Sequence, residues 1–298
     1  MEFGNRNSAR LFKEIQDSIC LALESCDGGA VFHEDLWQRE EGGGGRTRIF
    51  RNGNVIEKGG VNFSEVQGKT SEALRKQMLT NADEFYATGV SIVLHPHNPN
   101  VPIIHMNIRH FALSDGSMWY GGGIDLTPHY VDVNQAVWFH NQLKQVCDKH
   151  NRSYYPRFSD WADDYFYIPH REETRGVGGI FFDDLGRHEG NAATYEGFVL
   201  DVGRAFAPIY THLMNENRHK SFSDDQKQWQ LLRRGRYVEF NLVHDRGTRF
   251  GLLSNGRTES ILMSLPANAS WEYDYMPNPG SSEAETLRLL KKGVHRAQ

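Results

Sequence analysis

The chain has few cysteines, only three in 298 residues, and no Cys-x-x-Cys pair. An odd number of widely spaced cysteines (Cys20, Cys26 and Cys147) excludes a disulfide framework and a thiolate metal site. No stretch approaches about 18 consecutive apolar residues, so we expect no membrane span. Residues 1–10 lack the apolar centre of a signal peptide, and these features together predict a cytoplasmic protein.

A surplus of positive charge is also missing. Lys and Arg number 33 against 38 for Asp and Glu, which gives a formal net charge of -5. A dedicated nucleic-acid binder usually carries a basic surplus, so we expect no nucleic-acid partner. The apolar fraction of 39% is high enough for a packed core and excludes disorder. Repeats and linkers are absent, so residues 1–298 are predicted to form one domain.

Arginine and histidine are abundant instead. The basic residues divide into 23 Arg and 10 Lys, and eight of the 14 His lie between His95 and His170. An arginine fork binds carboxylates through paired hydrogen bonds better than a lysine does. An acidic chain that is rich in Arg therefore indicates local positive sites for an anionic ligand.

Two kinds of periodicity predict an α+β fold with helices covering a partly antiparallel sheet. Apolar residues three and four apart, and N-capping residues at Asp132 and Ser223, predict helices over 8–26, from 132, over 191–217 and over 223–235. Apolar and alternating runs predict strands over 90–94, 103–111, 118–120, 179–182, 237–243 and 249–253. The last two are expected to form a hairpin around residues 245–247.

The glycine-rich stretches do not fit a nucleotide site. After Gly42–Gly45 and after Gly121–Gly123 the third glycine of the dinucleotide fingerprint is missing, and Phe63 replaces the leading glycine of a P-loop before Gly68. Nucleotide binding is therefore disfavoured. These glycines either let the backbone approach a bulky ligand or neighbouring strand, or they form ordinary turns and bulges.

The strand predicted over 103–111 alternates in an unusual way. One face would carry His105, Asn107 and Arg109, while Met106 and Ile108 point to the other. A file of His, Asn and Arg packs poorly in a core and suits the wall of a polar ligand site. The alternative is a solvent-facing strand whose polar residues have no function.

Histidines could also hold a metal. His95, His105, His140 and His170 lack a local ligand signature such as H-E-x-x-H. Scattered histidines either converge on a divalent ion or serve separately as hydrogen-bonded core residues and proton carriers. The spacing leaves both interpretations open.

Three arginines and one aspartate complete the candidates. Arg109, Arg175 and Arg257 each lie near the end of a predicted strand, where ligand groups often gather. Together they favour a polycarboxylate ligand, although each alone is typical of a surface ion pair. Asp125 follows a glycine turn and would accept N–H donors from a ligand, act as a base, or cap the turn.

At these residues the chain resembles the oxygen-dependent coproporphyrinogen III oxidases. The resemblance spans nearly the whole chain and rests on long, specific motifs: HPHNPNVPIIHMNIR (95–109), WYGGGIDLTPHY (119–130), DDYFYIPHREETRGVGGIFFDDL (163–185) and GRYVEFNLVHDRGTRFGLLSNGRTESILMSLP (235–266).

The resemblance implies a reaction and a fold. The family converts two propionates of coproporphyrinogen III to vinyl groups, giving protoporphyrinogen IX with CO2 and hydrogen peroxide. O2 is the co-substrate and no organic cofactor is implied, because the porphyrinogen itself reduces oxygen. The implied fold is a large, flat, mainly antiparallel sheet covered by helices on both faces. The implied assembly is a homodimer, with dimer contacts over about 237–271.

Site residues carry over by motif. Positions assigned to substrate correspond to Ser91, Asn107, Ile108, Arg109, Asn255, Gly256 and Arg257. His105 corresponds to a proton donor, Asp125 to a carboxylate that meets the pyrrole nitrogens, and Arg175 to an arginine that handles propionates. His95, His105, His140 and His170 correspond to divalent-metal ligands, for an ion such as manganese. Relatives commonly have Gly where this chain has Asn255.

Two other functions compete with this interpretation. A divalent-metal oxygenase would use the four histidines as ligands. A non-catalytic porphyrin carrier would use the same arginines without turnover. In the oxidase, the implied route starts with loss of a pyrrole proton and addition of O2 to the ring. The peroxide then takes a hydrogen from the propionate as CO2 leaves.

Overall fold

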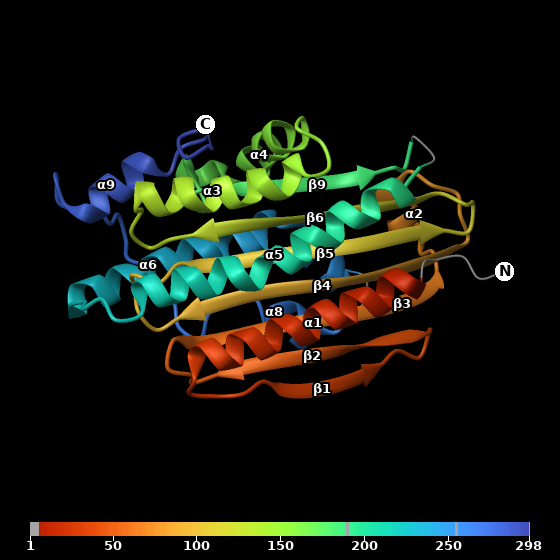
Figure 1. Ribbon diagram of the computed structural model, residues 1–298, viewed down its shortest axis with the longest axis horizontal. Helices are drawn as coiled ribbons and strands as arrows, with labels where there is room; N and C mark the ends of the chain where they lie inside the picture. Colours follow the sequence, from red (N-terminus) through yellow and green to blue (C-terminus); the bar gives the residue numbers. More distant parts are fainter. Residues whose placement is uncertain (1–5, 189–190, 254–255, 298) are drawn as a thin grey trace.

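The centre of the molecule is a seven-stranded antiparallel sheet with the order β1-β2-β3-β4-β5-β6-β9 (Figure 1). The computed structural model describes residues 6–188, 191–253 and 256–297. The strands of this sheet are β1 (His33–Gln38), β2 (Gly43–Arg51), β3 (Ile56–Lys69), β4 (Glu84–Pro96), β5 (Ile103–Leu113), β6 (Met118–Thr127) and β9 (Gly179–Leu185). The predicted α+β class with a mainly antiparallel sheet is confirmed.

Three long helices cover one face of the sheet. They are α1 (Arg6–Asp27), α3 (Val133–Asp148) and α5 (Ala193–Asn217), and they lie side by side in Figure 1. All three were expected from periodicity, and the side chain of Asp132 caps α3 by accepting from the backbone N–H groups of Asn134 and Gln135.

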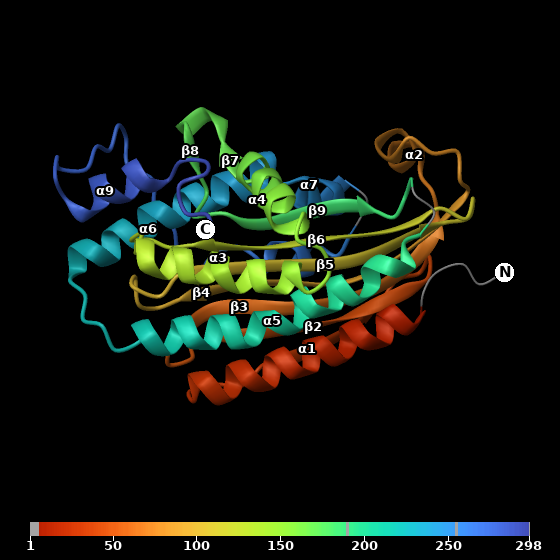
Figure 2. The same cartoon turned by 45° about the horizontal axis from the view of Figure 1, so that its top comes forward.

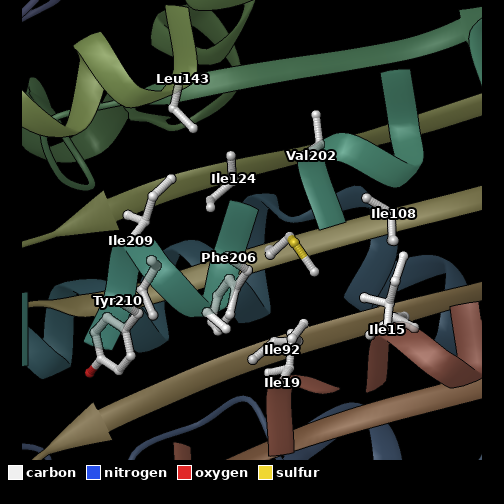
Figure 3. Packing of buried hydrophobic residues seen from close by; sticks show 14 of the residues in the cluster. Ile15, Ile19, Ile92, Ile108, Ile124, Leu143, Val202, Phe206, Ile209 and Tyr210 are labelled. Atoms are coloured by element: carbon white, nitrogen blue, oxygen red, sulfur yellow. The ribbon is translucent and has the colours of Figure 1, made fainter. Parts of the chain in front are cut away.

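The main core lies between these helices and the sheet. Apolar residues from α1 and α5 pack against those that β4, β5 and β6 point to the same face, as Figure 3 shows for Ile15, Phe206, Ile92, Ile108 and Ile124. All five side chains are at most 4% exposed. One face of every central strand therefore packs in the core, and the side chains of the other face do not contribute to it.

The C-terminal part of the chain covers the second face (Figure 2). It contains α6 (Asp224–Glu239), the π-helical turn η2 (Phe240–His244), α7 (Arg246–Leu253) and α8 (Thr258–Leu262). The remaining elements are α2 (Glu72–Met78), α4 (Tyr154–Tyr165), β7 (Tyr167–Ile168), η1 (Pro169–Arg171), β8 (Glu173–Thr174) and α9 (Ser282–Leu289). Helices therefore cover both faces, as predicted.

The strands predicted over 237–243 and 249–253 are wrong, because both segments are helical. Their β-branched and aromatic residues favour a strand, but Tyr237 and Phe240, three residues apart, are both buried, as expected on one face of a helix. The expected hairpin turn is the start of α7, where Asp245 Oδ2 accepts from the N–H of Thr248 at 2.6 Å.

The predicted helix after Ser223 is confirmed with its capping box, but it does not end at Gly235. A Cβ atom at Gly235 would lie 2.5 Å from the carbonyl oxygen of Ser270. This glycine therefore allows a close approach of two segments, and α6 continues to Glu239.

The first three strands were not predicted, and the glycine tract near residue 43 lies inside one of them. A Cβ atom at Gly44 or Gly45 would lie 2.2 Å from atoms of Trp37 on β1. The glycines therefore allow close contact between neighbouring strands, which was one of the two interpretations left open.

Candidate active site

A cleft of about 590 Å³ lies between the second face of the sheet and the C-terminal helical segments. Its volume is within the range of about 300–1,000 Å³ that small-molecule sites occupy. The sheet contributes Ser91, His105, Asn107 and Arg109, and the segments above it contribute Asn241, Asp245, Ser260 and Ser264. The file of polar residues predicted on β5 therefore lines a cleft and does not face open solvent.

Strand register aligns these side chains in rows. Ser91 pairs with Asn107, so a hydroxyl and an amide lie side by side across β4 and β5. Arg109 pairs with Gly89 on one side and Gly121 on the other, which leaves space around its long side chain. The sheet floor therefore offers hydrogen-bonding groups and one cation to a ligand.

Ile108 lies on the other face of β5. Its side chain is fully buried in the main core and points toward α1 and α5 (Figure 3). The alternation of a strand requires this, because Asn107 and Arg109 face the cleft. The side chain of Ile108 therefore does not line the cleft, and only its backbone is near the neighbouring site residues.

His105 is held by Asp125, which forms a buried ion pair with Arg175. His105 Nδ1 lies 2.7 Å from Asp125 Oδ1, and Arg175 Nη2 donates to both Asp125 oxygens at 2.9 and 2.8 Å. The side chain of His105 is 20% exposed, whereas those of Asp125 and Arg175 are each 2% exposed. Because a carboxylate only accepts here, the proton lies on Nδ1 and Nε2 is the ring nitrogen available to a ligand.

Arg175 is enclosed by aromatic rings and polar groups. Its guanidinium carbon lies 4.4 Å from the ring centre of Phe166, 4.8 Å from Tyr237 and 4.6 Å from Phe240, and Nη1 donates to Asn241 Oδ1 at 2.9 Å. The rings stabilise the cation through its π contacts. Arg175 also lines the cleft, but its charge is already matched inside the protein.

At both Asp125 and Arg175, the charged partners and the hydrogen bonds together change the pKa more than burial does. Burial disfavours the charged form of Asp125, yet the facing Arg175 and the bond from His105 lower the pKa of Asp125 below its usual value. Burial likewise opposes the charge of Arg175, but Asp125 raises the pKa of Arg175. Both groups are therefore ionised at neutral pH.

Arg109 is more accessible than Arg175. Its side chain is 34% exposed, Nη1 donates to Asn107 Oδ1 at 3.1 Å, and Nη2 lies 2.6 Å from Asp183 Oδ2. Burial opposes its charge, and Asp183 outweighs burial and raises the pKa of Arg109. The guanidinium is thus a fixed positive group at the cleft surface.

Several residues that line the cleft were not assigned a role from the sequence. They are Tyr165, Asp183, Asn241, Asp245 and Arg246. Tyr165 donates its hydroxyl hydrogen to Asp245 Oδ1 at 2.8 Å. The only sequence signal for Asp183 was its position after an apolar strand. Asn241 lay in a segment mistaken for a strand, and Asp245 lay in the turn of the expected hairpin.

The predicted Asn255-Gly256-Arg257 substrate motif is only partly described. Asn255 lies outside the described residues. Arg257 forms an ion pair with Asp35 on the edge strand β1, and the N–H of Gly256 donates to Gly251 O at 2.8 Å. Neither Gly256 nor Arg257 lines the cleft as the described residues define it. Their assignment to the substrate stays a prediction.

The four candidate metal ligands have separate partners. His95 Nε2 donates to Ser264 O at 2.8 Å, and burial lowers the pKa of His95 to about 3. His170 Nε2 lies 2.8 Å from Glu239. His105 pairs with Asp125, as described above.

His140 has a clear structural role. Its Nε2 donates to Val177 O at 2.8 Å, and its Nδ1 accepts from the hydroxyl of Tyr155 at 3.0 Å. Burial lowers the pKa of His140 to about 4. Within residues 6–188, 191–253 and 256–297, no group of three or more His, Cys, Asp or Glu could hold a metal. The four histidines therefore do not fit one shared metal site.

Comparison with known proteins gives a consistent picture. A sequence model of the family described as coproporphyrinogen III oxidase matches residues 7–295. An oxygen-dependent coproporphyrinogen-III oxidase of Drosophila melanogaster is 48% identical over 94% of this chain and 75% of its own length. The mitochondrial human protein of that name is 48% identical over 94% of this chain and 64% of its own, and the chloroplastic one of Glycine max is 47% identical over 93% and 76%.

The names of two relatives bear on location. They place the human protein in mitochondria and the soybean protein in chloroplasts, so the cytoplasmic location expected for this chain stays a prediction. None of the helices in the described part of the chain is both long and apolar enough to cross a membrane.

Proposed function

The chain belongs to the coproporphyrinogen III oxidase family, and we propose that it converts two propionates of coproporphyrinogen III to vinyl groups with O2. The products are protoporphyrinogen IX, two CO2 and two hydrogen peroxide, and the reaction belongs to haem and porphyrin biosynthesis. The observation that carries the proposal is 48% identity, over 94% of the chain, to a protein named for this activity.

The cleft supports this substrate chemically. Coproporphyrinogen III carries four propionates and four pyrrole N–H groups. Arg109 offers a guanidinium to a propionate, and Ser91 and Asn107 offer hydroxyl and amide groups beside it. Aromatic residues Phe111, Trp119 and Phe181 also line the cleft and suit the apolar parts of the macrocycle.

We assign the proton-transfer role to His105. Asp125 fixes its tautomer, so that Nε2 can take a proton from the bound substrate or return one. The resemblance predicts direct contact of Asp125 with the pyrroles and of Arg175 with a propionate. Because both oxygens of Asp125 are already bonded within the chain, the geometry instead supports a role for this pair in holding and charging His105.

Oxygen is the proposed oxidant, and no organic cofactor is part of the proposal. The porphyrinogen loses the electrons that reduce O2 to peroxide, so the substrate supplies the redox chemistry. The possible divalent metal enters no step, since the four histidines have other partners. The residues of the cleft bind the substrate, exclude water and move protons.

Incubation of the purified protein with coproporphyrinogen III, with and without O2, tests the function. We expect two CO2 and two hydrogen peroxide per protoporphyrinogen IX in air, and no product under argon. Binding without oxygen-dependent CO2 release would support the porphyrin carrier instead. Full activity after treatment with a chelator would exclude the divalent-metal oxygenase.

We also propose that the chain forms a homodimer through its C-terminal segments. Large apolar side chains there are exposed, including Val243 at 54%, Trp271 at 54% and Met276 at 79%. Exposed apolar side chains are typical of interaction surfaces, and Val243 and Trp271 lie within the segment that the resemblance assigns to dimer contacts. Sedimentation of the wild type and of Val243→Asp tests this: we expect a dimer that the variant weakens. A monomeric wild type would contradict it.

A further inference from the structure

A β-bulge near the end of β9 aims a carboxylate at the cleft. The pairing of β6 with β9 is irregular between Tyr120 and Gly122, so Asp183 and Asp184 both face Gly121. Asp184 takes a left-handed backbone conformation with φ 52°. A bulge redirects a side chain, and an unfavourable conformation retained beside a site is a sign of a functional constraint.

The redirected side chain is Asp183, and its partner is Arg109 on β5. Asp183 Oδ2 lies 2.6 Å from Arg109 Nη2, while Oδ1 accepts from the N–H of Asp184 at 2.9 Å. Both Asp183 and Arg109 line the cleft, with side chains 28% and 34% exposed. Arg109, the cation to which we assign a substrate carboxylate, therefore already holds a carboxylate of the chain.

The space for this pair comes from a missing side chain. A Cβ atom at Gly121 would lie 2.5 Å from Asp183 Oδ1 and 2.8 Å from Arg109 Nε. Gly121 lies on β6, between the strands that carry the two charged residues. The bulge on β9 thus directs Asp183 to the cleft, and the glycine on β6 leaves space for its ion pair with the arginine on β5.

We propose that Asp183 is a selectivity residue that competes with the carboxylates of the substrate for Arg109. A ligand carboxylate must displace Asp183, so a ligand with one carboxylate gains little from Arg109. A ligand with several carboxylates is held at other points as well and wins the exchange. This inference rests on the proposed function. When a product with fewer carboxylates leaves, Asp183 pairs with Arg109 again.

The variant Asp183→Asn tests the competition, because an amide keeps the shape and still accepts the N–H of Asp184 but loses the charge. We expect the dissociation constant for coproporphyrin III, the oxidised and unreactive tetracarboxylate, to fall about three- to tenfold in fluorescence titrations. KM for coproporphyrinogen III should fall by a similar factor, while kcat does not rise. A purely structural residue would not give tighter binding when changed.

Three further variants make the test specific. Asp183→Glu should keep the wild-type affinity. Asp201→Asn, on α5 at the other face of the sheet, makes the same change of net charge and should leave the affinity unchanged. In an Arg109→Gln background, Asp183→Asn should give no gain, because the effect acts through that arginine.

Equal or weaker binding by a folded Asp183→Asn protein, checked by circular dichroism, would overturn the competition. A gain that persists in the Arg109→Gln background would do so as well. A wild-type protein that does not turn over coproporphyrinogen III in air would instead refute the proposed function, and this inference with it.

Discussion

At the scale of single residues, the orientation of His105 decides what the cleft can do. One ring nitrogen is bonded to Asp125, so the other is left for the ligand. Asp125 is held in turn by Arg175, which three aromatic rings and Asn241 surround. The group to which we assign proton transfer is thus fixed by residues that the substrate does not have to touch.

Replacing Asp125 by Asn should therefore reduce turnover more than binding. The amide would donate to Nδ1, which leaves the proton on Nε2 and gives His105 the wrong tautomer. We expect kcat to fall by about 10²-fold or more, with a smaller change in KM. Steady-state assays measure both constants.

The same variant also leaves Arg175 without its counter-ion, so its stability needs a control. We expect a loss of about 3–5 kcal/mol in the free energy of unfolding by urea. Arg175→Met, which removes the charge, should recover part of the stability of Asp125→Asn but not its activity. Wild-type kcat in Asp125→Asn would disprove the role assigned to the carboxylate.

The sequence predicted part of this site by physical reasoning alone. Alternation along a strand requires His105, Asn107 and Arg109 to share a face, and they line the cleft together. The contact of Asp125 with His105 depends on the register between β5 and β6, which no local pattern encodes. The position of Asp183 depends on the bulge in β9, and this bulge also arises from tertiary packing and not from a local pattern.

At the scale of elements, α6 shows how tertiary contacts override local signals. Gly235 is a poor helix residue, and Tyr237 and Val238 favour strands, yet the helix continues through all three. The strands β4 and β5 and the helices α1 and α3 were predictable, because their periodic burial patterns are long. The segment after Gly235 was not, because its helix depends on packing against the sheet.

Replacing Gly235 by Ala should destabilise the protein, although alanine is the better helix former. Its Cβ would lie 2.5 Å from the carbonyl oxygen of Ser270, so one segment must shift. We expect a loss of about 1–3 kcal/mol in the free energy of unfolding by urea. Gly197→Ala is the matched control.

At Gly197, on α5, a Cβ would meet only His150 Cε1, at 3.6 Å, among the described residues outside the helix itself. Alanine there should stabilise the protein by about 0.4–1 kcal/mol. If both variants gained stability, Gly235 would not be required for the contact with Ser270.

At the scale of the whole molecule, buried neutral histidines make stability depend on pH. Burial lowers the pKa of His110 from 6.5 to about 4, and burial also places the pKa of His129 well below 6.5. Between these values the unfolded chain binds protons that the folded chain does not. The stability from these groups is therefore complete above pH 6.5 and is lost as the pH falls toward 4.

Thermal unfolding between pH 7 and pH 4 measures this dependence. The shift at His110 alone corresponds to on the order of 3 kcal/mol. His110→Leu, which cannot be protonated, should lose less stability over this range than the wild type does. The exposed His219 is the control, because its replacement by Gln should leave the slope unchanged. Equal slopes for the wild type and His110→Leu would refute the prediction.

The two-sided character of β5 also restricts how this protein can change over evolutionary time. Odd-numbered positions from His105 to Arg109 line the cleft, and the even positions Met106 and Ile108 lie in the core. Deleting a single amino acid within this stretch would exchange the two sets, placing apolar groups in the cleft and a cation in the core. The strand therefore tolerates substitutions better than it tolerates an insertion or deletion of one residue. In a scan of all single substitutions, changes at the positions that line the cleft should mainly reduce activity. Changes at the core positions should mainly reduce the abundance of the protein.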